Sequence, residues 1–138
     1  MGVAWGDAME TVSREFRPVA TAGTDARAFL RSTLETWELD GLGEVTELLT
    51  DELVTNVVRH ARTPMTVRAQ RRPSRIRVEV DDTNRDRPAL MHPEPLALNG
   101  RGMLLVDTLA DDWGTDVHDD GKTVWFEIDA RRAAEEMH

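Results

Sequence analysis

Three polar side chains in the segment DELVTNVVRHA recur at the spacing of a helical turn, although the rest of that helix is apolar. On a helix that turns about 100° per residue, Glu52, Asn56 and Arg59 project into one sector roughly 60° wide. A carboxylate there could orient or deprotonate a nucleophile, and an amide oxygen is a hard ligand suited to Mg²⁺. The same three residues could instead extend a solvated face, because Glu47 and Asp51 lie beside that sector.

Two further segments could bind a ligand. Asp81 and Asp82 follow the predicted strand RIRVEV, and a carboxylate at a strand end can accept hydrogen bonds of about 1.5–3 kcal/mol each, although Asp pairs also form ordinary turns. The segment NGRGM places glycines before a helix, so backbone N–H groups can approach a phosphate closely, and Arg101 adds a positive charge. Helices without any ligand also begin with glycine, so each signal has a structural alternative.

The elements that must position these residues follow from hydrophobic spacing and from glycine and proline. The two central strands place apolar residues on one face and mostly charged residues on the other, which is typical of a sheet covered on one side. We therefore predict an α+β fold, a two-layer sandwich of a mixed, mostly antiparallel sheet with helices on one face. The expected order is an edge strand in 11–19, helices in 25–39 (capped by Thr24) and 44–61, strands in 65–70 and 75–80, a helix in 102–113 and a hairpin in 114–128.

Composition limits the class of protein. The chain has 138 residues, of which 40% are hydrophobic and 31% charged, and this is ordinary for one globular domain. The net charge of −9 disfavours general nucleic-acid binding and favours basic partners. The absence of cysteine excludes disulfides, Cys-ligated zinc and a thiol nucleophile. Neither an apolar stretch of about 18 residues nor a signal sequence is evident, so we expect a cytoplasmic protein without a membrane segment.

The order of the signals is more informative than any one of them. Between the strand 75–80 and the helix 102–113 lies a long segment with three prolines and no clean period, and such loops are commonly functional or disordered. The features follow one another as a helix with Glu and Asn, a strand ending in Asp, a long loop, Gly-x-Gly before a helix, and a final strand with a Thr. Together they supply a metal ligand, a base contact, a lid and a phosphate cradle.

This order resembles the GHKL (Bergerat-fold) ATPases, which include histidine-kinase catalytic domains, gyrase B and MutL, over about residues 16–128. DELVTNVVRHA resembles their N box. The resemblance implies that Asn56 ligates Mg²⁺ on the phosphates of ATP and that Glu52 acts as general base or orients the attacking group. It also implies that Arg59 lies near the phosphates. The implied organisation is a flexible N-terminus (1–10), an ATP-binding kinase-like domain (11–129) and a polar tail (130–138).

The segment DDTNRDRP resembles the G1 box, D-x-G-x-G followed by an apolar residue and proline. Alignment on Pro88 implies that Asp82, rather than Asp81, is the adenine-binding carboxylate. Asn84 and Asp86 then replace the two glycines, and Asn and Asp are the residues that best tolerate positive φ.

The segment GRGM resembles the G2 box. This implies that Gly100, Arg101, Gly102 and Met103 bind the phosphates at the hinge of a lid. Thr123 in KTVW matches the threonine that helps Asp82 hold adenine, typically through water.

Within the superfamily, a domain of this size with these segments is similar to the RsbW-type anti-sigma factors. That branch implies a serine/threonine protein kinase that binds a sigma factor and phosphorylates an anti-anti-sigma (STAS-domain) protein, with a homodimer plausible by analogy. Two alternatives stay open: a non-catalytic ATP-binding module that sequesters a regulator, which the altered G1 box motivates, and a detached histidine-kinase-like catalytic domain. His60 lies inside the N box and is a poor candidate for a phosphoacceptor.

Overall fold

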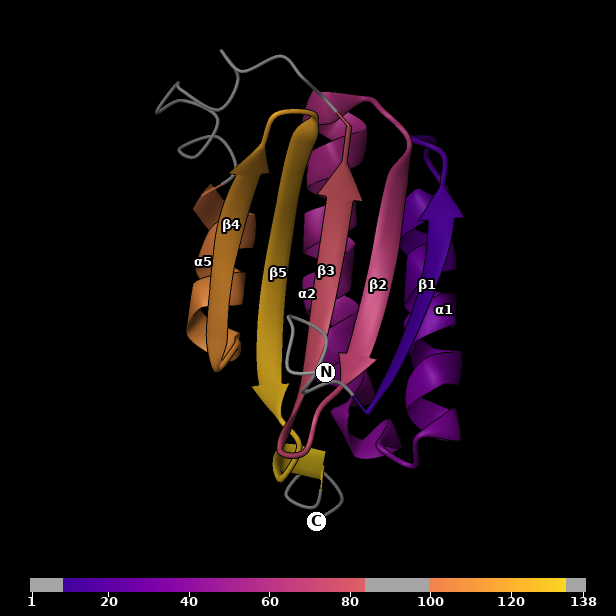
Figure 1. Cartoon of the computed structure of the whole chain (residues 1–138), viewed down its shortest axis with the longest axis vertical. Helices are drawn as coiled ribbons and strands as arrows, with labels where there is room; N and C mark the ends of the chain where they lie inside the picture. Colours follow the sequence, from indigo (N-terminus) through magenta and orange to yellow (C-terminus); the bar gives the residue numbers. More distant parts are fainter. Residues whose placement is uncertain (1–8, 84–99, 134–138) are drawn as a thin grey trace.

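The computed structural model describes residues 9–83 and 100–133, and the side chains of 100–102 are not described. Five strands form one sheet in the order β1-β2-β3-β5-β4, and each of these four pairings is antiparallel. The helices lie together behind one face of the sheet (Figure 1), which confirms the predicted two-layer sandwich. The elements are β1 (Glu10–Phe16), α1 (Ala22–Thr36), η1 (Asp40–Leu42), α2 (Gly43–Asn56), η2 (Val57–Ala61), β2 (Met65–Arg71), β3 (Arg75–Asp82), α5 (Gly100–Leu109), β4 (Asp112–His118) and β5 (Gly121–Asp129).

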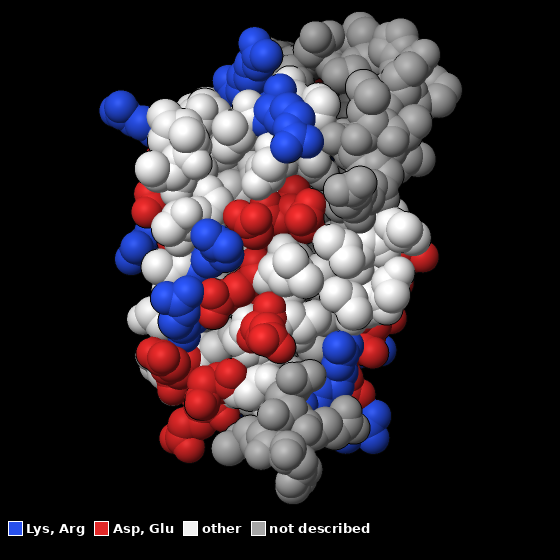
Figure 2. Space-filling view, turned by 180° about the vertical axis from the view of Figure 1, so that it is seen from behind, with Lys and Arg blue, Asp and Glu red and all other residues white. Residues whose placement is uncertain are grey.

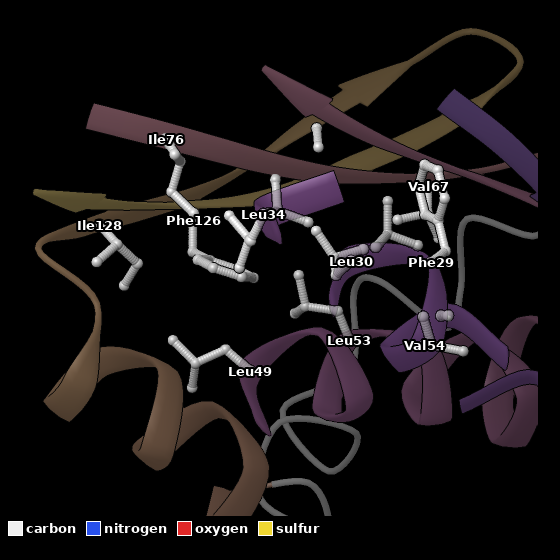
Figure 3. Close-up of a cluster of buried hydrophobic side chains, with 14 of the residues drawn as sticks. Phe29, Leu30, Leu34, Leu49, Leu53, Val54, Val67, Ile76, Phe126 and Ile128 are labelled. Carbon is white, nitrogen blue, oxygen red and sulfur yellow. The ribbon is translucent and has the colours of Figure 1, made fainter. Parts of the chain in front are cut away.

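The core lies between the sheet and the helices. In β3, Ile76, Val78 and Val80 alternate with charged residues, and all three are buried on the helix side. Figure 3 shows how side chains from both layers point into this space. Burial of each such side chain contributes roughly 1.5–3 kcal/mol, so the alternation fixes which face of each strand meets the helices. The buried hydrophobic residues of α1, α2 and α5 are Ala22, Ala26, Phe29, Leu30, Leu34, Leu49, Leu53, Val54 and Val106.

The first helix begins earlier than the sequence predicts. Its N-cap is Thr21, and Thr24 lies inside the first turn, where its hydroxyl accepts a hydrogen bond from the Arg27 guanidinium (3.2 Å). The reason is tertiary packing. A Cβ on Gly23 would lie 2.3 Å from a carboxylate oxygen of Asp51, so the first turn packs directly against α2. Contact with α2 therefore extends the helix past the residue that would cap it best in isolation.

The second helix does not end as a regular α-helix. After Asn56 the chain forms the π-helical turn η2 and leaves it at Arg62, which has φ 57°. A π turn is wider than an α turn, so each residue rotates by less than about 100°. The unbroken α-helix from which the position of Arg59 was predicted therefore ends before Arg59.

The described residues that follow β5 pack against the domain. The Ala130 N–H donates to the Ser74 carbonyl (2.9 Å), and the Arg132 guanidinium donates to the Leu109 carbonyl (2.8 Å). No helix within the described parts of the chain has both the length and the apolar character needed to cross a membrane.

Candidate nucleotide site

Four chain segments that are far apart in sequence meet at one end of the molecule. The end of α2 with η2, the end of β3, the start of β5 and the start of α5 all lie at the top in Figure 1. The antiparallel order explains the meeting, because β3 runs toward this end and β5 leaves from it. All the predicted site residues that the structure describes lie in or beside these segments.

Glu52 and Asn56 belong to a different side of α2 from the charged residues next to them. The Asn56 amide donates to the Met103 sulfur of α5 (3.8 Å). Glu47 and Asp51 instead face α1, where their carboxylates pair with Arg31 (2.7 Å) and Arg27 (4.0 Å). The charged residues near the sector are therefore contacts between α1 and α2, and they do not extend one solvated face through Glu52 and Asn56.

Glu52 is half-buried and forms no ion pair or hydrogen bond with any side chain that the structure describes. Arg59 is exposed on η2. Figure 2 shows the helix-covered face, with acidic side chains from the middle to the lower left and basic side chains at the top, along the left and at the lower right. The basic side chains at the top, the end where η2 lies in Figure 1, favour an anion there.

Asp82 is the last residue of β3 and faces the helix side of the sheet. It is 4% exposed as a residue, and one of its carboxylate oxygens accepts a hydrogen bond from the Lys122 ammonium at 2.6 Å. Strand register produces this contact, because Asp82 is paired with Lys122 across β3 and β5. A buried carboxylate requires such compensation, since an isolated charge would be strongly destabilising.

Thr123 does not meet Asp82, and here the sequence-based expectation needs correction. The Thr123 hydroxyl donates to Asp81 at 2.7 Å, and the two residues are paired in register on the open face of the sheet. Side chains alternate across a strand, so Thr123 points away from the face that carries Asp82. Lys122, its neighbour in sequence, occupies the position expected for Thr123.

Gly121 is a site residue that sequence reasoning missed. Its φ is 152°, and a Cβ at this position would lie 2.0 Å from the Asp82 carbonyl oxygen. The missing side chain lets the start of β5 lie directly against the end of β3 and so places Lys122 beside Asp82. The sequence signal was the triplet DDG, which read as an ordinary hairpin turn.

The end of the sheet is hollowed beside the Asp82–Lys122 pair. A depression of about 250 Å³ is lined by Asp82, Thr83 and Lys122 together with residues of the open face, among them Asp81 and Thr123. A larger groove of about 440 Å³ lies elsewhere, between β1 and α1, and its lining includes Phe29. The groove contains none of the predicted nucleotide-binding residues.

The predicted phosphate cradle is described only in part. The helix α5 begins at Gly100 and ends at Leu109, so it starts and ends earlier than the helix predicted over 102–113, and Met103 is half-buried against α2. The side chain of Arg101, the surroundings of Gly102, and Asn84 with the rest of 84–99 lie outside the described residues.

The described residues fit a magnesium ion held mainly by a bound phosphate. Within 9–83 and 100–133, no group of three or more His, Cys, Asp or Glu side chains is placed to hold a metal. Mg²⁺ bound with nucleotides commonly takes one or two protein oxygens and completes its shell with phosphate and water. The Asn56 amide donates its N–H to Met103, and its oxygen is the hard donor that such a site requires.

Comparison with protein families agrees with this arrangement. The sequence model of the family described as Histidine kinase-like ATPase domain matches residues 15–128. The chain belongs to this family. The match runs from the end of β1 to the end of β5 and includes all four segments that meet at the candidate site. No curated protein gives a significant sequence match to the chain.

Proposed function

We propose that this histidine kinase-like ATPase domain is an ATP- and Mg²⁺-dependent serine/threonine protein kinase that acts as an anti-sigma factor. In this proposal it phosphorylates an anti-anti-sigma STAS-domain protein and so switches partners. The observation that carries the proposal is the separation of Glu52 and Asn56 from the ion pairs of α1 and α2, beside the start of α5. This leaves a carboxylate and an amide for chemistry at the end where the glycine-led helix begins.

Each described group has a role that its surroundings support. Asp82, buried at the end of β3, accepts a hydrogen bond from the nucleotide base. The first N–H groups of α5 face the phosphates, because a helix start favours an anion. In this proposal Arg59 and Arg101 add positive charge around the phosphates. Mg²⁺ held through Asn56 would supply charge neutralisation on those phosphates.

Glu52 is the candidate catalytic residue. Its position one turn before Asn56 brings a carboxylate to the same phosphates, where it can accept the proton of an incoming serine or threonine hydroxyl. A carboxylate already paired with arginine would serve this role poorly, and Glu52 has no such pairing among the described side chains. The hydroxyl oxygen then forms a bond to the terminal phosphorus as its proton passes to Glu52. The bond from that phosphorus to the bridging oxygen breaks, and ADP leaves with the electron pair.

The proposed partners are proteins, and the charge distribution supports this. An acidic domain of net charge −9 attracts basic protein surfaces and repels nucleic acid. The groove between β1 and α1 offers a second surface, with the outer edge of β1 beside it, and is where we place a homodimer or a bound sigma factor.

Phosphate transfer from labelled ATP to a STAS-domain protein tests the proposal. Glu52→Ala should lower the transfer rate by about 10²- to 10⁴-fold, the usual contribution of a general base, while ATP still raises the melting temperature. Glu44→Ala is the matched control, because Glu44 is exposed in the first turn of the same helix. Undiminished transfer by Glu52→Ala would overturn the catalytic assignment.

One alternative has an observation in its favour. The Lys122–Asp82 contact occupies an oxygen of the base-binding carboxylate, which suits a module that holds nucleotide weakly and works by sequestering its partner. Such a module would bind the partner in the same assay without transferring phosphate. A detached histidine-kinase-like domain would instead give an acid-labile phosphohistidine, whereas the proposed kinase gives an acid-stable phosphoserine or phosphothreonine.

A further inference from the structure

The chain contains a single lysine, Lys122, and its ammonium binds the carboxylate of Asp82, which is proposed to bind the base. Lys122 is the only lysine among the 17 Lys and Arg residues, and the described ion pairs on the open face of the sheet use arginine. Its ammonium lies 2.6 Å from an Asp82 oxygen. An ammonium is a compact charge with three rotatable N–H donors, whereas a guanidinium is a rigid planar fork.

The two side chains of this ion pair differ in their exposure to solvent. The Asp82 side chain is 1% exposed and the Lys122 side chain 18% exposed, and both residues line the depression at the end of the sheet. A ligand at this end of the sheet therefore reaches the Lys122 ammonium more readily than the Asp82 carboxylate. An ionised carboxylate has about four lone-pair sites and can hold Lys122 while it accepts another hydrogen bond.

We propose, resting on the proposed nucleotide function, that Lys122 is a specificity-determining residue that lets the base site accept 6-oxopurine nucleotides as well as ATP. Adenine presents a donor at its 6-amino group and an acceptor at N1. Hypoxanthine presents the reverse, an acceptor at O6 and a donor at N1–H. A carboxylate with an ammonium beside it matches either edge. Asp82 accepts a hydrogen bond from the donor of either base, and Lys122 donates one to its acceptor.

A carboxylate alone would discriminate strongly between these edges. It would accept the 6-amino group of adenine but would oppose the O6 lone pairs of hypoxanthine with its own negative charge. Lysine, like arginine, contacts a purine O6 well, since a charged N–H donor on a carbonyl oxygen is a strong hydrogen bond. Lys122 thus removes the penalty that a lone Asp82 would impose on a 6-oxopurine.

The experiment compares the dissociation constants of Mg·ATP and Mg·ITP by titration calorimetry on the full chain. In the wild type the two constants should lie within about threefold, because the pair serves both edges. In Lys122→Met the ratio should move by about tenfold or more toward ATP, as expected for loss of one hydrogen bond to a charged group. Lys122→Arg keeps a cation and should keep most of the wild-type ratio.

The ratio of the two dissociation constants reports specificity and is independent of stability. Any unfolded fraction of a variant weakens the apparent binding of both nucleotides equally. An unchanged ratio in Lys122→Met, with both nucleotides bound, would overturn the role of Lys122 and leave the proposed function standing. Failure of the wild type to bind either nucleotide would overturn the proposed function itself.

A second measurement covers the case in which Lys122→Met does not fold. Lys122 is the only side-chain amine, so an amine-reactive reagent reports on it directly in the peptide that contains it. Saturating ATP and saturating ITP should both slow this labelling of the wild-type protein several-fold. Labelling at the same rate with bound nucleotide would place the base away from Lys122 and overturn the inference.

Discussion

Asp81 and Asp82 are adjacent in sequence but lie in two different environments. Asp81 faces the open side of the sheet, where it binds Arg68 (2.7 Å) and the Thr123 hydroxyl (2.7 Å). Asp82 faces the helix layer, where it is buried and binds Lys122. The same residue type thus becomes part of a structural ion-pair network in one position and a candidate ligand contact in the next.

The charged side chains described on the open face of the sheet pair with one another and so have a structural role. Arg77 binds Glu79 (2.8 Å) and Glu127 (2.9 Å), and its guanidinium lies 3.9 Å from the centre of the Trp125 ring. Arg75 also binds Glu127. These charges are matched several times over and leave little for a ligand. On the helix side, Lys122 binds Asp82 at the end of the sheet, beside a depression that residues of both faces line.

The largest expected effect comes from the residue that brings the two strands together at the site. Gly121→Ala places a methyl group 2.0 Å from the Asp82 carbonyl oxygen and forces an unfavourable φ, so the end of β3 must move. We expect a loss of roughly 3 kcal/mol of stability or more, measured by urea unfolding. Gly114→Ala is the control, since there the added methyl meets the Trp125 ring instead of backbone. Equal losses in both would show that the β3 end tolerates displacement.

The next effect separates the two aspartates by ligand binding. ATP at about 100 times its dissociation constant should stabilise the wild type by about 2.7 kcal/mol, seen as a rise of several degrees in melting temperature. Asp82→Ala should abolish the rise, whereas Asp81→Ala and Thr123→Val should keep it despite weakening the open-face network. Each variant is compared with its own ligand-free state. Loss of the rise in Asp81→Ala alone would move the site to the open face.

The smallest effect is a pH dependence of the open-face network. Burial raises the pKa of Glu127, but hydrogen bonds from Arg75 and Arg77 outweigh this and hold the pKa below its ordinary value of 4.5. The stabilisation is therefore complete above about pH 4.5 and is lost as the pH falls through the lower folded-state value. In Glu127→Gln, the loss of unfolding free energy between pH 4.5 and lower pH should be smaller than in the wild type by roughly 1 kcal/mol. The same loss in both proteins would show that Glu127 is not its source.

Strong periodicity made most of the fold predictable. The alternation in β2 and β3 specified which face meets the helices. The placing of a nucleotide site at Asn56 and the end of β3 stays a prediction from the family pattern. The start of α1 was misplaced because contact between Gly23 and α2 overrides local capping. The α-helical geometry predicted around Arg59 is wrong because the sequence contains no local signal for a π turn.

The partner of Asp82 could not be read from spacing. Thr123 and Lys122 are one residue apart, and only the register between β3 and β5 decides which of them faces the helices. A one-residue difference in register exchanges the two faces of a strand completely. Family motifs match residue types along the chain, whereas the face of each residue depends on how strands that are distant in sequence pair.

The position of β1 at the edge of the sheet has a consequence for how the molecule assembles. Among the described strands β1 pairs only with β2, in a register that joins Glu10 to Arg71 and Phe16 to Met65, so both helices α1 and α2 lie inside the closed segment. Closing so long a segment costs more entropy than forming the β2–β3 hairpin, whose strands are three residues apart. We therefore expect β1 to dock late in folding and to open first in the native state, taking one wall of the groove against α1 with it.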